Sequence, residues 1–153
     1  MLPDDTRLML VTQDLKANSG SRASYIMRIV AKGGGFRPET LRKLKPEQLA
    51  RDIVRRKLET LQDEVGYLQL LYVELQPEIQ IAFCDAAGVA HENGSIPEEL
   101  PMPLASEADV RAAAESLVST FGDRGRHYLM TVATYNAEAW PGLAEWLEAK
   151  AAG

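Results

Sequence analysis

Cysteine and histidine are scarce in this chain, whose 153 residues contain one cysteine and two histidines. A single cysteine cannot form an internal disulfide, so we expect a reducing compartment, the cytoplasm. No apolar run approaches the roughly 18 to 20 residues that a membrane-spanning helix needs. The first residues, Met1 to Thr6, carry acids where a secretion signal would carry Lys or Arg. The sequence therefore predicts a cytoplasmic protein with no membrane partner.

The few metal-binding side chains do not follow the spacing of a metal site. The nearest candidate set for zinc is Cys84, His91, Glu92 and His127. No two of its members form the close Cys or His pair of a structural zinc site, and Ser95 stands where a zinc-protease motif would have its second histidine. A di-iron bundle would need Glu three residues before each histidine, and Gly88 and Arg124 occupy those positions. We therefore predict no metal and no cofactor.

The stretch Ala82–Gly94 contains the cysteine and one histidine, which raises the question of a reactive site. A catalytic cysteine needs a base beside it and a lowered pKa. Cys84 instead falls between Phe83 and Ala86 on an expected helix, where a small buried thiol is the common outcome. We interpret the stretch as the end of a helix at Gly88 and the turn after it, and we predict no enzymatic activity.

Apolar spacing predicts helices nearly throughout the chain. The residues that follow one another in steps of three and four are Leu58, Leu61, Val65, Leu68, Tyr72 and Leu75. From them we predict one long central helix from about Pro46 to Leu75, ending before Pro77. The expected fold is all-α: a single domain over residues 1–153, an irregular bundle of six or seven helices around that central helix. The alternative is an α+β fold with a small hairpin at about residues 67–84, because Ile79–Phe83 alternates like a strand.

Glycines and prolines mark the expected interruptions. Gly33 to Gly35 should end a helix that starts near Ser21, and the loop from Lys32 to Arg37 is read as a linker because it lacks a phosphate-binding motif. Prolines at 97, 101 and 103 predict an internal connector over residues 90–105.

Charge is divided along the sequence. Residues 1–58 contain 13 Lys and Arg against 6 Asp and Glu, whereas residues 59–153 contain 4 against 16, within a total of −5. Three interpretations stay open. The two halves could pack with opposite charges facing or solvate separate faces, the first half could bind a polyanion, or molecules could associate head to tail.

Two sets of residues are candidates for binding a partner. Around the last expected helix, the set is Trp140, Leu143, Trp146 and Leu147, which either lock that helix onto the bundle or form an exposed anchor for a protein partner. In the basic segment 37–57, the polyanion candidates are Arg42, Lys43, Lys45, Arg51, Arg55, Arg56 and Lys57.

The leading functional hypothesis is a non-catalytic cytoplasmic interaction or adaptor module. It would act on a protein partner, or on a second copy of itself as a homodimer, through charge-polarised helical surfaces. The alternative is a nucleic-acid or polyanion-binding protein that uses the basic segment 37–57, although the pI near 5.1 argues against it. A second alternative is a small-ligand-binding or enzymatic bundle with a pocket around His127, Tyr128 and Tyr135.

Overall fold

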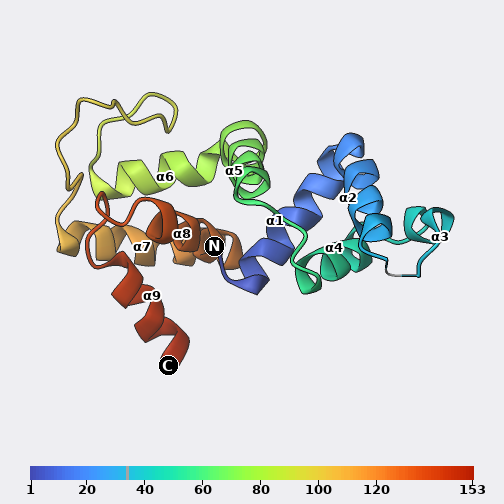
Figure 1. Ribbon diagram of the computed structural model, residues 1–153. Helices are drawn as coiled ribbons and strands as arrows, with labels where there is room; N and C mark the ends of the chain where they lie inside the picture. The colour runs from blue at the N-terminus through green and yellow to red at the C-terminus, as the bar shows by residue number, and fades with distance from the viewer. Residues whose placement is uncertain (34) are drawn as a thin grey trace. The chain divides into compact units, whose positions relative to one another are not determined.

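The computed structural model describes residues 1–33 and 35–153, and it confirms the all-α fold class. Within these residues the chain forms nine α-helices and one π-helix, more than the six or seven helices expected, and no strand (Figure 1). The alternative hairpin at residues 67–84 is wrong because that segment is helical on both sides of Gln76. The only pairing of extended backbone among the described residues is an isolated bridge between Glu92 and Ser95.

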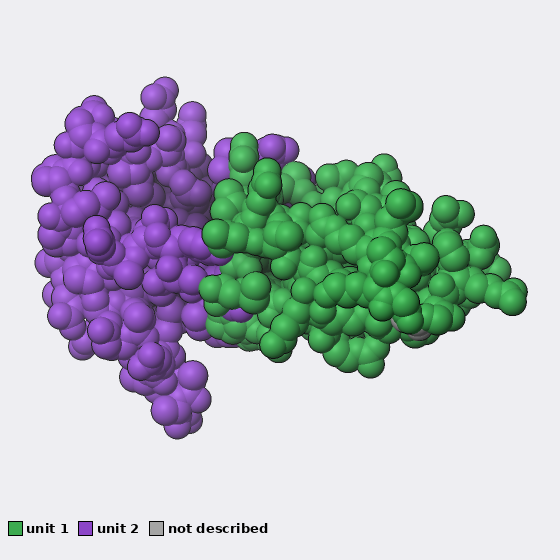
Figure 2. Space-filling model, in the orientation of Figure 1, with its two compact units in different colours: residues 1, 3–71 green, residues 2, 72–153 purple. Residues whose placement is uncertain are grey.

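The chain divides into two compact units, each described here by itself (Figure 2). Unit 1 comprises residues 1 and 3–71, and unit 2 comprises residues 2 and 72–153. Unit 1 contains 13 Lys and Arg against 9 Asp and Glu, a net charge of +4. Unit 2 contains 4 against 13, a net charge of −9. The expectation of a single domain over residues 1–153 stays a prediction.

Unit 1 is built around its first helix. Its elements are α1 (Asp4–Ala17), α2 (Ser19–Ala31), α3 (Pro38–Arg42), α4 (Pro46–Arg55), α5 (Leu61–Gln69) and the start of the π-helix η1 (Leu70–Leu75). Helix α1 packs against α2, α4 and α5, while α3 packs against α2. The side chains of Leu10, Ile29, Leu49 and Ile53 are fully buried between these helices.

The predicted long helix from Pro46 to Leu75 is interrupted. Helix α4 ends at Arg55, and Lys57 adopts the left-handed conformation with φ of 52°. Helix α5 then starts with a capping box, in which the Asp63 N–H donates to the Thr60 hydroxyl at 3.2 Å and the Thr60 N–H donates to the Asp63 carboxylate at 2.7 Å. These bonds satisfy N–H groups that a new helix leaves without partners, so the sequence Thr60-Leu-Gln-Asp63 favours a helix start where apolar spacing predicted continuity.

A buried ion pair lies at the interruption between α4 and α5. Glu59 lies in the non-helical segment, and its carboxylate accepts from the Arg7 guanidinium of α1 through Nε at 3.1 Å and Nη2 at 2.9 Å. The Arg7 and Glu59 side chains are only 4% and 2% exposed. Arg7 also pairs with the exposed Asp4 at 2.8 Å. A buried charge needs such partners, and Glu59 meets Arg7 from the non-helical segment between α4 and α5.

Unit 2 contains the rest of η1 and helices α6 (Pro77–Ala87), α7 (Glu107–Phe121), α8 (Asp123–Tyr135) and α9 (Leu143–Ala152). Helix α7 packs against α6, α8 and α9. At the centre, the Phe83 ring meets those of Tyr128 and Trp140, with centroids 5.7 and 4.7 Å apart. Residues 90–105 form no helix, and the Gln80 side-chain amide donates to the Gly94 carbonyl, which holds this segment on α6.

Candidate functional site

The four candidate anchor residues lie in the core of unit 2. The side chains of Trp140, Leu143, Trp146 and Leu147 are all buried. They therefore lock the last helix onto α7 and α8 and do not form an exposed patch, because burial removes the surface that an anchor needs. Their role in binding a partner stays a prediction. Trp146 and Leu147 nevertheless line a hollow that opens beside α9.

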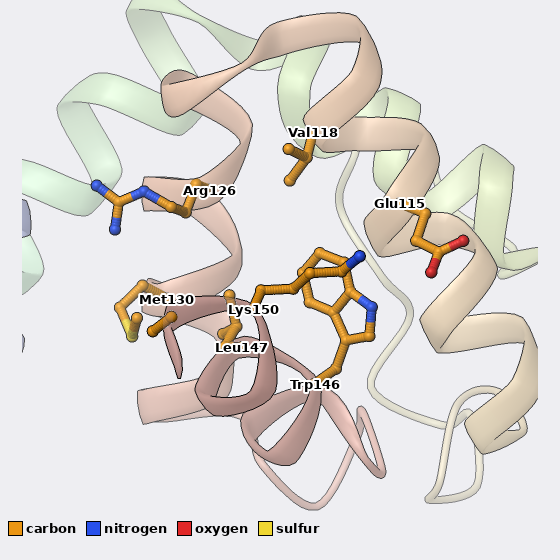
Figure 3. Close-up of a pocket in the computed structure, with 8 residues that line it drawn as sticks. Glu115, Val118, Arg126, Met130, Trp146, Leu147 and Lys150 are labelled. Carbon is orange, nitrogen blue, oxygen red and sulfur yellow. The ribbon is translucent and has the colours of Figure 1, made fainter. Parts of the chain in front are cut away.

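This hollow lies between α7, α8 and α9 and has a volume of about 640 Å³ (Figure 3). Its lining residues are Glu115, Val118, Arg126, Met130, Trp146, Leu147, Lys150 and Ala151. The Lys150 ammonium lies 5.5 Å from the centre of the Trp146 ring, a cation–π contact. The buried indole N–H of Trp146 has no hydrogen-bond acceptor within the described residues.

A second hollow, the α2–α3 groove, belongs to unit 1. It has a volume of about 300 Å³ and is lined by Ala23, Ile26, Met27, Val30, Ala31, Pro38 and Arg42. Met27 is 72% exposed and Val30 is also exposed. Sequence reasoning missed this groove because it followed only the buried face of α2. The signal was a second apolar stripe at Ala23, Met27 and Val30, spaced by four and three residues.

The basic candidates differ in what they already bind. Among them Arg55 pairs with Asp52 at 2.6 Å, and the half-buried Arg56 lies over the Phe36 ring at 5.2 Å. The exposed candidates that form no salt bridge to a described residue are Arg42, Lys43, Lys45, Arg51 and Lys57. These five cations therefore remain available to a partner.

Two further arginines of the basic half have structural roles. Arg22 donates to the carbonyl oxygens of Arg42 and Leu44 at 3.2 and 2.9 Å, which holds α3 against α2. Arg28 binds the Asp63 carboxylate through two nitrogens at 2.7 and 3.2 Å. Partial burial alone would raise the pKa of Asp63, but the hydrogen bonds from Arg28 and Thr60 outweigh it and hold this pKa below its usual value. The same carboxylate raises the pKa of Arg28.

In the glycine loop after α2, the structure describes Gly33 and Gly35. Helix α2 ends at Ala31, and Gly33 and Gly35 have φ of 71° and 70°. These angles favour glycine, in agreement with the predicted end of the helix. Gly34, the middle glycine of the predicted linker, lies outside the described residues.

The stretch around Cys84 is the end of a helix and a turn, as predicted. Cys84 is fully buried in α6, and Gly88 closes this helix with φ of 70°. Burial raises the pKa of the Cys84 thiol to about 11, and the negative charge of Asp85 adds to this effect. His91 folds back onto Asp85, with Nε2 2.7 Å from the carboxylate, while its Nδ1 accepts from the Gly94 N–H at 2.9 Å. Both ring nitrogens thus hold the turn in place.

The pocket suggested around Tyr128 is part of the core. The Tyr128 ring packs edge-on against Tyr72 with centroids 5.0 Å apart, and burial raises the pKa of its hydroxyl. On the same helix, Arg126 and Met130 line the hollow beside α9 instead. Within the described residues, no group of three or more His, Cys, Asp or Glu side chains is placed to hold a metal ion.

Comparisons with protein-family models, with curated proteins and with solved structures found no match to this chain. None of the helices in the described part combines the length and the apolar character that a membrane crossing requires. The two hollows and the charges around them are therefore the features from which we infer a function.

Proposed function

We propose that this protein is a non-catalytic cytoplasmic interaction module whose unit 1 binds an acidic amphipathic helix of a partner protein in the α2–α3 groove. The observation that supports this proposal best is an exposed apolar groove in a unit of net charge +4. Exposed apolar patches that are bordered by polar residues mark interaction sites in soluble proteins.

The chemistry of the groove favours such a partner. The exposed side chains of Met27 and Val30 offer apolar surface, and fully burying a side chain of this kind contributes about 1.5 to 3 kcal/mol. Arg42 lines the groove, and the exposed Lys32 and Arg37 adjoin its lining residues in the sequence. An apolar helix face with Glu or Asp along its edges complements both features, because opposite charges across an interface favour association and register.

The test uses a fluorescein-labelled model peptide that presents Leu at i, i+4 and i+7, Glu along the edges of this face and Ala elsewhere, with binding followed by fluorescence anisotropy. We expect saturable binding that weakens with salt, and weaker binding of the same peptide with Lys in place of Glu. Met27→Asp should reduce the affinity at least tenfold, while the matched control Met102→Asp, at a methionine of unit 2 that is 58% exposed, should leave it unchanged. Equal effects of the two substitutions, or no binding of the Glu peptide, would refute the proposal.

A second copy of this chain is another partner to test, because α5 exposes Leu61 and Val65 on one face, where two copies could associate. Light scattering over a range of concentrations decides this point. A dimer that Val65→Glu dissociates and Met27→Asp does not would place the self-contact on α5, separate from the groove.

Polyanion binding is a second candidate function, supported by the exposed cations without salt bridges on and around α3 and α4. The seven candidates of segment 37–57 would then act through phosphate or sulfate contacts, whose strength falls with salt. Retention on heparin at low salt that is lost in a Lys43→Ala/Lys45→Ala/Arg51→Ala variant would favour this function. Unchanged retention in that variant would exclude this surface.

A further inference from the structure

The hollow between α7, α8 and α9 combines an apolar floor with two cations. Val118, Met130, Trp146 and Leu147 supply the apolar surface, while Arg126 and Lys150 supply the positive charge. A volume of about 640 Å³ lies within the range of roughly 300 to 1,000 Å³ that is typical of small-molecule sites, which are mostly apolar with a few polar groups. The composition therefore fits a ligand that has a long apolar part and one anionic group.

The cations are notable because unit 2 as a whole is acidic. Its four Lys and Arg residues are Arg111, Arg124, Arg126 and Lys150, and two of them line this hollow. Arg111 and Arg124 are engaged elsewhere, with Glu107 at 3.2 Å and Glu78 at 2.8 Å. A unit with a net charge of −9 thus places half of its positive charge around one apolar hollow.

Lys150 is the cation best placed to receive an anion. It forms no salt bridge to a described residue, and its ammonium lies over the Trp146 ring. Arg126 is already engaged, with the exposed Asp123 at 3.6 Å and with Nε2 of His127 at 3.5 Å. In the view of Figure 3, the Arg126 guanidinium points away from Trp146, whereas Glu115, the one acidic side chain of the lining, lies on the same side as the Lys150 ammonium.

The indole of Trp146 gives a second, independent observation. Its ring is buried, and its N–H has no acceptor among the described residues, a situation that costs about 1 to 3 kcal/mol. An oxygen of a ligand held by Lys150 would accept from this N–H once the lysine side chain moves off the ring. The same ligand would then satisfy a cation and an unpaired donor together.

We propose that this hollow binds a single-chain anionic amphiphile. Its carboxylate or phosphate head group would lie at Lys150, beside the Trp146 N–H, and its alkyl chain would cover Val118, Met130 and Leu147. This site belongs to unit 2 and is independent of the α2–α3 groove of unit 1.

The test is a titration of the whole protein with decanoate, decyl phosphate and decanol below their micelle concentrations, followed by tryptophan fluorescence and calorimetry. Trp146 lines the hollow, so its emission should change on binding. We expect saturable binding of at least one anionic probe, with decanol at least tenfold weaker. The anionic probe that binds more tightly shows whether the natural source is a free carboxylate or a phosphorylated lipid.

Variants at the edge of the hollow make the result specific. Lys150→Gln should weaken anion binding at least threefold, and Ala151→Phe should abolish it by filling the opening, because both residues are exposed and neither change disturbs the core. Arg111→Gln removes the same charge from unit 2 outside this hollow and should have no effect. The proposal fails if no anionic probe saturates, if decanol binds as tightly, or if Arg111→Gln and Lys150→Gln are equivalent. Met27→Asp should leave this binding intact, which separates its outcome from that of the proposed function.

Discussion

Replacing Arg7 by methionine tests whether the buried ion pair determines the path of the chain between α4 and α5. Methionine keeps much of the length and the apolar stem of arginine but removes its charge. The substitution leaves the Glu59 carboxylate, 2% exposed, without the guanidinium that donates to both of its oxygens. Breaking a buried pair by removing one partner typically costs about 3 to 5 kcal/mol, because an uncompensated charge stays in the interior. Against a typical total stability of about 5 to 15 kcal/mol, such a loss is large.

The other corners of the mutant cycle follow from the same geometry. Glu59→Leu should cost less than Arg7→Met, because the carboxylate of Asp4, 2.8 Å away, still pairs with Arg7. The free energy of unfolding of the double variant Arg7→Met/Glu59→Leu should lie within about 1 kcal/mol of the wild-type value or exceed it. Well-packed apolar residues often replace a buried ion pair without loss of stability. The two single changes are therefore strongly non-additive.

Urea unfolding followed by far-UV circular dichroism measures these differences. The matched control is Arg55→Met, because the exposed Arg55 pairs with Asp52 at 2.6 Å and exposed pairs contribute about 0 to 1 kcal/mol. If Arg7→Met costs no more than Arg55→Met, or if the double variant is as unstable as the sum of the single ones, the ion pair does not hold this segment. Tryptophan emission recorded in parallel reports unit 2 alone, since Trp140 and Trp146 both belong to it. Coincident transitions would support the prediction of a single domain.

Three further predictions concern single positions. A Cβ at Gly125 would lie 2.8 Å from the Leu117 carbonyl oxygen, so Gly125→Ala should lower the free energy of unfolding by about 1 to 3 kcal/mol, measured with urea. The control is Gly66→Ala, whose Cβ meets no atom within 4 Å and which should stabilise the protein slightly. Equal effects of the two substitutions would contradict this prediction. The buried Cys84 thiol, with its pKa raised to about 11, should react with a disulfide reagent at least a hundredfold more slowly in native protein than in urea, and comparable rates would show that it is accessible. Burial raises the pKa of Asp14 in the folded protein above 3.8, so ionising this carboxyl destabilises the fold. This loss of stability is absent below the pKa of Asp14 in the unfolded chain, and it grows as the pH rises to the pKa in the folded protein. Asp14→Asn should therefore stabilise at pH 7, by an amount that shrinks as the pH falls toward 4, and a pH-independent difference would rule out this cause.

Helix positions were largely predictable because the signals are local. The prediction that the helical segment ends before Pro77 is confirmed, since η1 ends at Leu75 and α6 begins at the proline. The start of α7 also has a local signal, because the Ser106 hydroxyl accepts from the Asp109 N–H at 3.1 Å and so caps the helix. Each of these signals involves residues within one turn of one another, so no knowledge of the tertiary structure is needed.

The prediction of one long central helix was wrong because apolar spacing carries no information about the hydrogen bonds that end one helix and start the next. The stripe from Leu58 to Leu75 runs through the interruption, yet Leu61 and Val65 are 62% and 51% exposed, whereas Glu64 between them is buried. A capping box at Thr60 and Asp63 was present in the sequence and competed with this spacing. The decisive partner was Arg7, which lies 52 residues from Glu59 and could not be paired with it from sequence.

The sequence contains the exposed apolar stripe of α2, but it does not show that either hollow exists. The α2–α3 groove depends on the angle between two helices that a glycine loop connects, and the hollow beside α9 depends on how three helices leave space around Trp146 and Leu147. The sequence identified these two residues and left open whether they lock the last helix onto the bundle or form an exposed anchor, but it gave no sign of a hollow beside them. Spacing shows which side chains share a helix face, but only the packing of helices shows whether that face is filled.

The division of charge along the sequence also takes a different meaning in the structure. Glu59 and Asp63 belong to the acidic half by position, yet they bind Arg7 and Arg28 of the basic half, so opposite charges of the two halves do meet. Both pairs lie inside unit 1. Because unit 1 extends to residue 71, it also includes Glu59, Asp63 and Glu64, and its excess is +4 instead of the +7 over residues 1–58. The charge left to attract an acidic partner is therefore carried by exposed side chains such as Arg42, Lys43 and Arg51, and salt should weaken that attraction while leaving the buried Arg7–Glu59 pair nearly unaffected.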